Sequence, residues 1–271
     1  MDSRRLELLR ALDIDVWQRR DRPRPIADEF VAVVPSPAAA LRVAAAPRVA
    51  PPADPFPAPQ QHAPKVAEIA PPAFDKPLPD VSGMGWDALA RTVSECTLCD
   101  LHQTRTRPVF GVGNRQAQWM IVGEAPGADE DRQGEPFVGK AGQLLNEMLR
   151  AVGLAREDVF IANILKSRPP GNRDPRPEEV RACVPYLYRQ IELVNPRLIL
   201  CVGRIAAQNL LNTTETIGRL RGRLHQLATG RPMIVTYHPA YLLRSPAEKR
   251  KSWADLVLAM QTFERLGGAH A

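Results

Sequence analysis

The sequence has 271 residues, and its 36 Lys and Arg against 30 Asp and Glu give a formal net charge of +6 at pH 7. It contains no apolar run of about 18 residues, so we expect no membrane-spanning helix, and four cysteines are too few for a disulfide scaffold. Residues 1–85 hold 15 of the 27 prolines and as many acidic as basic side chains, so the whole positive excess lies in residues 86–271. A basic folded region indicates a polyanionic partner.

Residues 1–85 have the composition of an appendage. Residues 4–17 have helical periodicity, which predicts a short amphipathic helix within residues 1–20. Residues 21–85 are rich in Pro and Ala without helical or strand periodicity, as is typical of a flexible linker. The helix either docks on a protein partner or folds back on its own domain. Acidic side chains near the N-terminus argue against a secretory signal, so we expect a cytoplasmic protein, and we also expect a monomer.

The remaining residues alternate strand-like and helix-like segments, and we assign 86–271 to one domain. Short apolar runs predict buried parallel strands at 119–122, 159–164, 198–202 and 233–236. Amphipathic periodicity predicts helices at 141–152, 177–194, 205–211 and 253–260. Such alternation predicts a parallel sheet with helices on both faces, and in such sheets the site lies beyond the carboxyl ends of the strands.

The residues after the first strand can form part of a site. Gly123, Glu124 and Ala125 come directly after it, and the glycines around Pro126 predict a tight turn that directs the Glu124 carboxylate into a cleft. An ordinary acidic turn would have the same pattern. Phe137 follows on a loop, where its ring can stack on a flat ligand or belong to the core.

The residues after the second strand suit contacts with a nucleic acid. The amide of Asn163 offers one donor and one acceptor group, which is enough to recognise the polar edge of a pyrimidine, although a lone Asn more often caps a turn. Lys166, Arg168 and Arg173 suit DNA phosphates, or they belong to a solvated loop.

The residues after the fourth strand complete the pattern. His238 can donate a hydrogen bond to a developing anion. Leu242 and Leu243, which we expect on a loop beside Arg244, can wedge into a base stack. Each feature alone is a weak signal, but their position at successive strand ends favours one common site.

The cysteines form a further candidate site. Cys96 and Cys99 make a Cys-x-x-Cys pair at the start of the folded region, and Cys183 follows much later. Such a pair is half of a zinc or iron–sulfur site. Cys201 lies inside an apolar strand and is expected to be a buried small hydrophobe. Three plausible ligands remain, one short of four.

Several of these motifs, in this order along the chain, resemble the family 4 uracil-DNA glycosylases, and the resemblance extends from about Cys96 to Phe263. It rests on Gly123-Glu124-Ala125-Pro126-Gly127, Pro136-Phe137-Val138-Gly139-Lys140-Ala141-Gly142, Asn163 and His238-Pro239-Ala240-Tyr241-Leu242-Leu243-Arg244. The resemblance implies a three-layer α/β/α fold with a four-stranded parallel sheet and a 4Fe–4S cluster. It also implies removal of uracil from single- or double-stranded DNA by hydrolysis of the glycosidic bond, the first step of base excision repair.

The resemblance implies roles for individual residues. Glu124 would position or activate water, and Phe137 would stack on the uracil ring. Asn163 would pair with the polar edge of uracil, and His238 would bond the uracil oxygen that gains charge. Glu130 would help to exclude the methyl group of thymine. The implied uracil-binding residues are Gly123, Glu124, Ala125, Phe137, Asn163 and His238.

The chain departs from the family at one cluster ligand. The family uses four cysteines, and the positions correspond to Cys96, Cys99, residue 167 and Cys183, but residue 167 is Ser. Either Ser167 supplies an oxygen ligand, or the cluster is labile or lost, or another side chain substitutes. We expect a bound cluster because three thiolates remain.

Two other functions are compatible with the same fold. A crosslinking branch of the fold carries a Lys-Arg-Arg-Ile-His loop, whereas residues 169–175 here contain no His. A non-catalytic module that binds uracil or DNA and is recruited through residues 1–20 is the alternative from another functional class. The presence of Glu124, Asn163 and His238 favours an enzyme.

Overall fold

The computed structural model describes residues 77–268 of the chain. The predicted N-terminal helix, and all of the predicted linker before residue 77, lie outside the described residues. Val81, which we assign to the linker from the sequence, is buried and packs with Leu89 and Tyr186. Packing in the described part therefore begins a few residues before residue 86.

Six strands form one mixed sheet in the order β1-β3-β2-β4-β6-β5. The strands are β1 (Val112–Gly113), β2 (Trp119–Gly123), β3 (Phe160–Asn163), β4 (Leu198–Val202), β5 (Leu224–Gln226) and β6 (Pro232–Thr236). The four predicted strands are present and pair in parallel, whereas β1 and β5 pair antiparallel at the edges. The prediction of a four-stranded, all-parallel sheet is wrong because two short edge strands without an apolar run complete the sheet.

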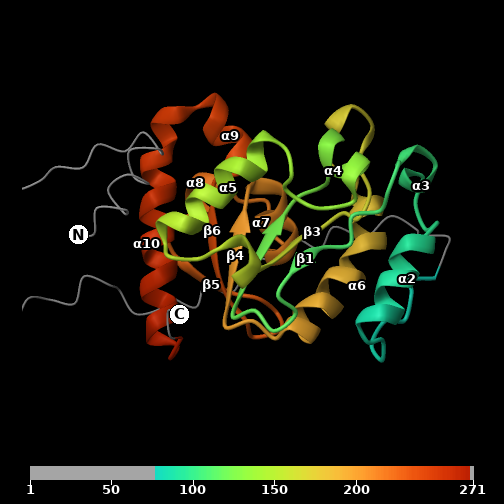
Figure 1. Cartoon of the computed structure of the whole chain (residues 1–271), viewed down its shortest axis with the longest axis horizontal. Coiled ribbons are helices and arrows are strands. Elements are labelled where there is room, and N and C mark those ends of the chain that lie inside the picture. The colour runs from blue at the N-terminus through green and yellow to red at the C-terminus, as the bar shows by residue number, and fades with distance from the viewer. Residues whose placement is uncertain (1–76, 269–271) are drawn as a thin grey trace, which may run out of the picture. The chain divides into compact units, whose positions relative to one another are not determined.

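Helices cover both faces of the sheet (Figure 1). They are α2 (Trp86–Glu95), α3 (Leu101–Thr104), α4 (Ala128–Gln133), α5 (Lys140–Ala151), α6 (Pro177–Val194), α7 (Arg204–Leu211), α8 (Ile217–Leu220), α9 (Pro239–Arg244) and α10 (Lys249–Arg265). Three short 3₁₀ turns are η1 (Arg156–Asp158), η2 (Pro170–Asn172) and η3 (Pro246–Glu248). Within residues 77–268, none of the helices has the length and hydropathy needed to cross a bilayer.

Alternate side chains of the central strands face opposite helix layers. Trp119 and Ile121 of β2 belong to an apolar cluster with residues of α5, α9 and α10. Met120 and Val122 belong to a second cluster with residues of α6, α7 and α8. Successive side chains of a strand point to opposite faces, so a strand between two helix layers must be apolar throughout. This explains why the sequence of β2 has no polar alternation.

The helix boundaries follow from local capping signals. α6 begins at Pro177, and the Glu179 carboxylate accepts a hydrogen bond from the Arg176 N–H at 2.8 Å. The helix ends at Val194, and the backbone of the next residue, Asn195, adopts the left-handed conformation that favours Asn and Gly. The same combination of Pro at the start and a left-handed residue at the end made the bounds of this helix predictable.

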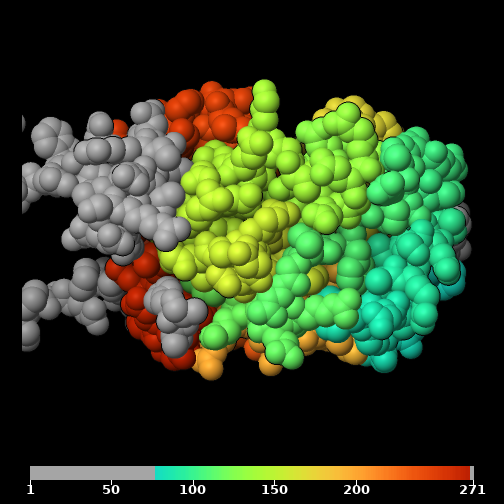
Figure 2. All heavy atoms as spheres, viewed as in Figure 1, coloured from blue at the N-terminus to red at the C-terminus, as the bar shows by residue number. Residues whose placement is uncertain are grey.

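A separate small apolar cluster joins α2 to α6. Leu89 and Val93 of α2 pack against Tyr186 of α6. Figure 1 shows α2 beside α6, and Figure 2 shows the side chains of this N-terminal segment, in cyan, as a continuous surface at the same end. The packing places the loop after α2, which carries Cys96 and Cys99, next to α6, which carries Cys183.

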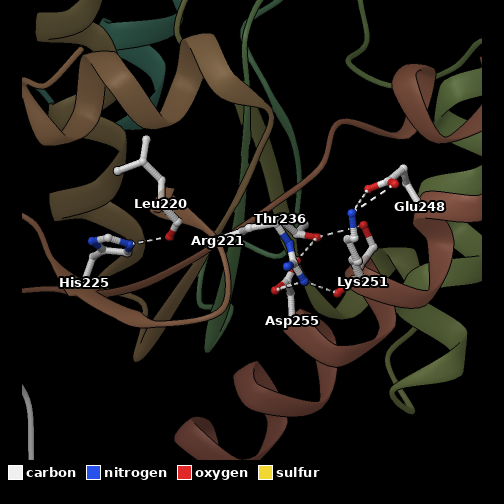
Figure 3. A network of polar contacts seen from close by, with 8 residues as sticks. Leu220, Arg221, His225, Thr236, Glu248, Lys251 and Asp255 are labelled. Carbon is white, nitrogen blue, oxygen red and sulfur yellow. Dashed lines mark hydrogen bonds and ion pairs between the residues drawn. The ribbon is translucent and has the colours of Figure 1, made fainter. Parts of the chain in front are cut away.

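A buried ion pair connects the residue that follows α8 to α10, and the end of β6 is hydrogen-bonded to the same pair (Figure 3). The Arg221 guanidinium donates two hydrogen bonds to the Asp255 carboxylate, at 2.8 and 3.0 Å, and Asp255 is fully buried. The Thr236 hydroxyl at the end of β6 also donates to Asp255, at 2.9 Å. Because His238 follows two residues later, this network holds the end of the strand from which the candidate site is built.

We expect replacement of Arg221 by Met to destabilise the fold by about 3 kcal/mol, because the buried Asp255 carboxylate would lose its charged partner. Arg223→Met is the matched control, since Arg223 pairs with Glu215 at the surface and the loss should stay below about 1 kcal/mol. Urea denaturation of the two variants measures the difference. Equal losses in the two variants would show that the buried pair does not stabilise this part of the fold.

Candidate functional site

The ends of the parallel strands meet where the sequence predicts the site. Gly123 of β2 is the register partner of Asn163 of β3, and Phe137 lies against both. The Gly203 N–H after β4 donates to Thr236 at the end of β6, and His238 lies against Gly203. In Figure 1 the arrowheads of β2 and β4 point toward the part of the molecule where α5 and α9 lie.

Gly123 leaves the space in which the other groups meet. A Cβ atom at residue 123 would lie 2.4 Å from the Asn163 Oδ1 atom and 2.6 Å from the Phe137 ring. Both distances are shorter than van der Waals contact, so any larger residue would displace the amide or the ring.

The Asn163 side chain is buried and lacks a partner for its carbonyl oxygen. Asn163 is 2 % exposed, and its Oδ1 atom has no hydrogen-bond partner among the described residues. An unsatisfied buried acceptor is costly, so such a group calls for a partner, which a ligand in the site can supply. The amide is therefore available to bind a ligand that supplies a donor.

Phe137 and His238 form one wall of the site. Their rings are stacked, with centroids 5.6 Å apart and an interplanar angle of 29°. The Phe137 backbone has φ = +54°, in the left-handed region that bulky residues rarely adopt. The ring is thus held in a definite place beside the Asn163 amide.

His238 is neutral at physiological pH and presents a donor. Its Nδ1 atom accepts a hydrogen bond from the Ala240 N–H at 3.1 Å, which places the proton of the neutral ring on Nε2. Burial, with a contribution from the Arg244 charge, lowers the pKa of His238 to about 4. The side chain is therefore a neutral Nε2–H donor, and the residue also caps α9.

Glu124 follows β2 and is half-buried. Burial and the nearby Asp174 carboxylate raise the pKa of Glu124 to about 7, and the Arg204 charge opposes this effect. Asp174 and Arg204 form an ion pair at 2.9 Å. The sequence motifs did not identify this pair, because its members lie in a loop and at the start of α7, 30 residues apart.

Glu130 has a contact role that the sequence motifs did not predict. Its Oε1 atom accepts hydrogen bonds from the N–H groups of Val138 and Gly139, at 3.0 and 3.1 Å. Its Oε2 atom accepts one from the Gly127 N–H at 3.1 Å. The carboxylate thus holds the backbone of the loop that carries Phe137.

Two of the predicted DNA contacts are at odds with the structure. Lys166 is 2 % exposed, and its Nζ atom donates to the Asn163 carbonyl and to the Gln190 side chain, at 2.8 and 2.7 Å, so it cannot reach a phosphate. Leu242 is 1 % exposed and belongs to the core. The leucines lie on α9 rather than on the predicted loop, and the helical period directs Leu242 inward.

The other predicted DNA contacts lie at the surface or near it. Leu243 is 45 % exposed, and Arg244 is exposed beside it. Arg168 is half-buried and donates to the Asn172 side chain at 2.7 Å. Arg173 forms a bidentate ion pair with Glu179, so part of its hydrogen-bonding capacity is used within the chain.

The three predicted cysteine ligands lie around Tyr186. The Cys99 and Cys183 thiols share a hydrogen bond, which lowers the pKa of Cys99 to about 7, and Cys96 hydrogen-bonds with the Tyr186 hydroxyl. These soft donors have the chemistry that iron prefers. Within the described part of the chain, however, no three Cys, His, Asp or Glu side chains are spaced as a metal site.

Ser167, the candidate fourth ligand, already has a hydrogen-bond partner within the chain. Its hydroxyl is buried and accepts a hydrogen bond from the Arg105 guanidinium at 3.1 Å. The same guanidinium donates to the Ser94 carbonyl at 2.7 Å, two residues before Cys96. Arg105 thus joins the segment before the Cys-x-x-Cys pair to residue 167, a connection that the sequence motifs did not predict. The three cysteines therefore have the donor chemistry of a cluster, although the described side chains are not spaced as a metal site.

Comparison with known proteins decides the family. A family model described as the uracil DNA glycosylase superfamily matches residues 110–258, which include every strand-end residue described above. The chain belongs to this superfamily.

Several relatives are similar to this chain over most of their own length. A type-4 uracil-DNA glycosylase from Archaeoglobus fulgidus is 49% identical over 176 residues, which are 62% of this chain and 88% of that protein. One from Pyrobaculum aerophilum is 44% identical over 185 residues, 65% of this chain and 93% of that protein. A type-5 uracil-DNA glycosylase from Thermus thermophilus is 32% identical over 151 residues, 49% of this chain and 68% of that protein. The predicted resemblance to the family 4 enzymes is confirmed.

Proposed function

We propose that this chain removes uracil from DNA by hydrolysing the N-glycosidic bond, which leaves an abasic site and begins base excision repair. The observation that carries the proposal is the buried, unpartnered Asn163 oxygen beside the stacked rings of Phe137 and His238. Membership of the superfamily and the names of the relatives support the same activity.

The Asn163 amide has the donor and acceptor pattern that distinguishes uracil from cytosine. Uracil presents an N3–H donor beside the O4 acceptor, and the Asn163 amide can accept from the first and donate to the second. Cytosine presents the reverse pattern and would leave the buried amide oxygen unsatisfied, which is costly. The Phe137 ring supplies an apolar face for stacking.

His238 suits the stabilisation of the leaving group. When the glycosidic bond breaks, negative charge develops on uracil, and the Nε2–H donor of His238 is fixed by its Nδ1 hydrogen bond to Ala240. Fixed donors to developing anions typically contribute about 3–4 kcal/mol to a transition state. The low pKa of His238 means that it acts as a hydrogen-bond donor and need not transfer a proton.

Glu124 suits the activation of water and the stabilisation of the sugar. As a carboxylate, it can orient a water molecule and favour the positive charge that develops on the sugar. Its pKa of about 7 means that the carboxylate form dominates only above neutral pH. A non-catalytic binding module would not need a carboxylate there, so the placement of Glu124 favours catalysis.

The surface around α9 suits the opening of the DNA. A base inside a duplex must leave the stack before it reaches a buried pocket, at a cost of a few kcal/mol. Leu243, the exposed member of the leucine pair, can fill the space that the base leaves, and Arg244 can bind phosphate. Leu242 packs α9 against the core and does not contact DNA in this arrangement.

For the cofactor, we propose that Cys96, Cys99 and Cys183 hold an iron–sulfur cluster and that Ser167 is not a ligand. A cluster supplies a structural link between segments that are distant in the sequence. Here it would tie the loop after α2 to α6, and the hydrogen bonds of Arg105 to Ser94 and Ser167 provide a link that needs no metal.

We expect the purified chain to produce alkali-labile sites at uracil in end-labelled, single-stranded DNA, and Glu124→Ala to abolish this cleavage. A matched oligonucleotide with cytosine or thymine at the same position should stay intact, because cytosine lacks the required edge pattern and thymine adds a methyl group. Gel electrophoresis after alkali treatment measures the products. Tight binding of uracil-DNA without cleavage would instead support the binding-module hypothesis.

The pH profile of kcat/KM should rise with pH to a plateau, with a midpoint near 7, because the Glu124 carboxylate is the active form. Asp174→Asn removes a nearby negative charge, lowers the pKa of Glu124 and should shift this midpoint to lower pH. Arg204→Met removes the opposing positive charge and should shift the midpoint to higher pH. Shifts of the midpoint in the same direction in both variants, or no shift, would contradict the assignment of this pH dependence to Glu124.

The protein purified without oxygen should be brown and contain iron, and Ser167→Cys should slow the loss of iron in air by supplying a fourth thiolate. Iron analysis and visible absorption measure both effects. Ser94→Cys is the matched control, because it adds a thiol at a neighbouring exposed position. An active protein that contains no iron would contradict the proposal for the three cysteines.

A further inference from the structure

The loop that carries Phe137 has an unusual backbone conformation. Among the described residues, the non-glycine positions with positive φ are Phe137, Asn172, Asn195 and Asn212. Asn adopts the left-handed region readily because of its short polar side chain, whereas a bulky aromatic residue does not. Such a conformation persists when surrounding contacts determine it, and it is found preferentially at functional sites.

Arg156 supplies such contacts on the carbonyl side of the loop. It lies in η1, just before β3, and its guanidinium donates to the Pro136 carbonyl at 2.6 Å and to the Phe137 carbonyl at 3.2 Å. It also donates to the Asn146 side chain of α5 at 3.3 Å. The planar guanidinium thus fixes two successive carbonyl groups relative to α5.

Glu130 supplies the matching contacts on the N–H side. Its carboxylate accepts from the N–H groups of Val138 and Gly139, the two residues that follow Phe137. The peptide groups before and after Phe137 are therefore held by two charged side chains. Rotation of the Phe137 backbone to a relaxed conformation would break hydrogen bonds to both.

Steric contacts around Phe137 also restrict the backbone of its loop. A Cβ atom at residue 142 would lie 1.8 Å from the Phe137 carbonyl oxygen, so the loop rests directly on the backbone of α5 at Gly142. The ring in turn lies between Gly123 and the His238 ring. The position of the ring therefore depends on the position of the backbone to which Arg156 is bonded.

We propose that Arg156 is a positioning residue for base recognition: it holds Phe137 in the strained conformation that places the ring where a flipped uracil stacks. This inference rests on the proposed function and adds to it a residue that does not touch the base. Lys cannot replace Arg here, because an ammonium group lacks the rigid fork that bonds two carbonyl groups at once.

Binding is the first test. In Arg156→Met, we expect the Kd for DNA that contains the non-hydrolysable analogue 2′-fluoro-2′-deoxyuridine, and the KM for uracil-DNA, to rise about tenfold with a much smaller change in kcat, as for a contact that substrate and transition state share. Arg156→Lys should show the same loss, although it keeps the charge. Wild-type affinity in Arg156→Lys would contradict the inference, because charge alone would then suffice. Arg150→Met is the matched control, since Arg150 pairs with Glu147 on the exposed face of α5 and should bind like the wild type.

A double-mutant cycle separates positioning from a direct contact. In a Phe137→Ala background, Arg156→Met should cause no further loss of affinity, because the ring that it positions is absent. An undiminished loss in that background would overturn the inference and indicate that Arg156 acts on DNA directly. Amide hydrogen exchange of residues 134–140 gives a readout independent of DNA, and it should become faster in Arg156→Met and Arg156→Lys but not in Arg150→Met.

The same experiments distinguish the failure of this inference from the failure of the proposed function. If the wild type excises uracil and Glu124→Ala does not, the function stands, and unchanged affinity and hydrogen exchange in Arg156→Met overturn only the role of Arg156. If the wild type neither excises uracil nor binds the analogue, the proposed function fails and this role of Arg156 fails with it.

Discussion

The parallel pairing of β2 with β3 places Gly123 directly opposite Asn163, and the candidate site depends on this register. The missing side chain at residue 123 provides the space that the Asn163 amide and the Phe137 ring share. A slip of one residue would turn the Asn163 side chain to the opposite face of the sheet. Because both faces of β2 are packed against helix layers, such a slip would disrupt two cores at once. The pairing of the strands therefore sets the relative positions of Gly123, Asn163 and Phe137 independently of the charged side chains.

The central strands and the longest helices were predictable because burial on both faces leaves a continuous apolar run. The run at 119–122 covers all of β2 except Gly123, and α6 has the predicted bounds, which are marked by Pro177 and by Asn195. The edge strands β1 and β5 were not predictable, since strands of two or three residues with exposed side chains carry no period. α9 was missed although Pro239 at its first position is a helix signal, because six residues are too few for a clear pattern.

The positions of the site residues in the chain could be predicted, but the direction of several side chains could not. Lys166 follows a strand in a basic segment, and from the sequence it suits DNA. In the fold, the Lys166 ammonium is buried because it donates to the Asn163 carbonyl and to the side chain of Gln190, 24 residues away. The partners of Ser167 and Phe137 likewise come from distant segments, Arg105 and Arg156. Contacts of this kind depend on tertiary packing and leave no local signal.

Burial changes the two central titratable groups in opposite directions with one common result. It raises the pKa of Glu124 to about 7 and lowers the pKa of His238 to about 4, so both side chains carry less charge near neutral pH than they would in water. Uracil is neutral when it binds, and charge appears on the base and the sugar only as the glycosidic bond breaks. The neutral His238 donor and the carboxylate form of Glu124 are in place before the bond breaks, so they interact more strongly with the charged transition state than with the neutral substrate, and that difference accelerates a reaction. The Phe137 ring stacks on His238 and so contributes to the burial that keeps this donor neutral.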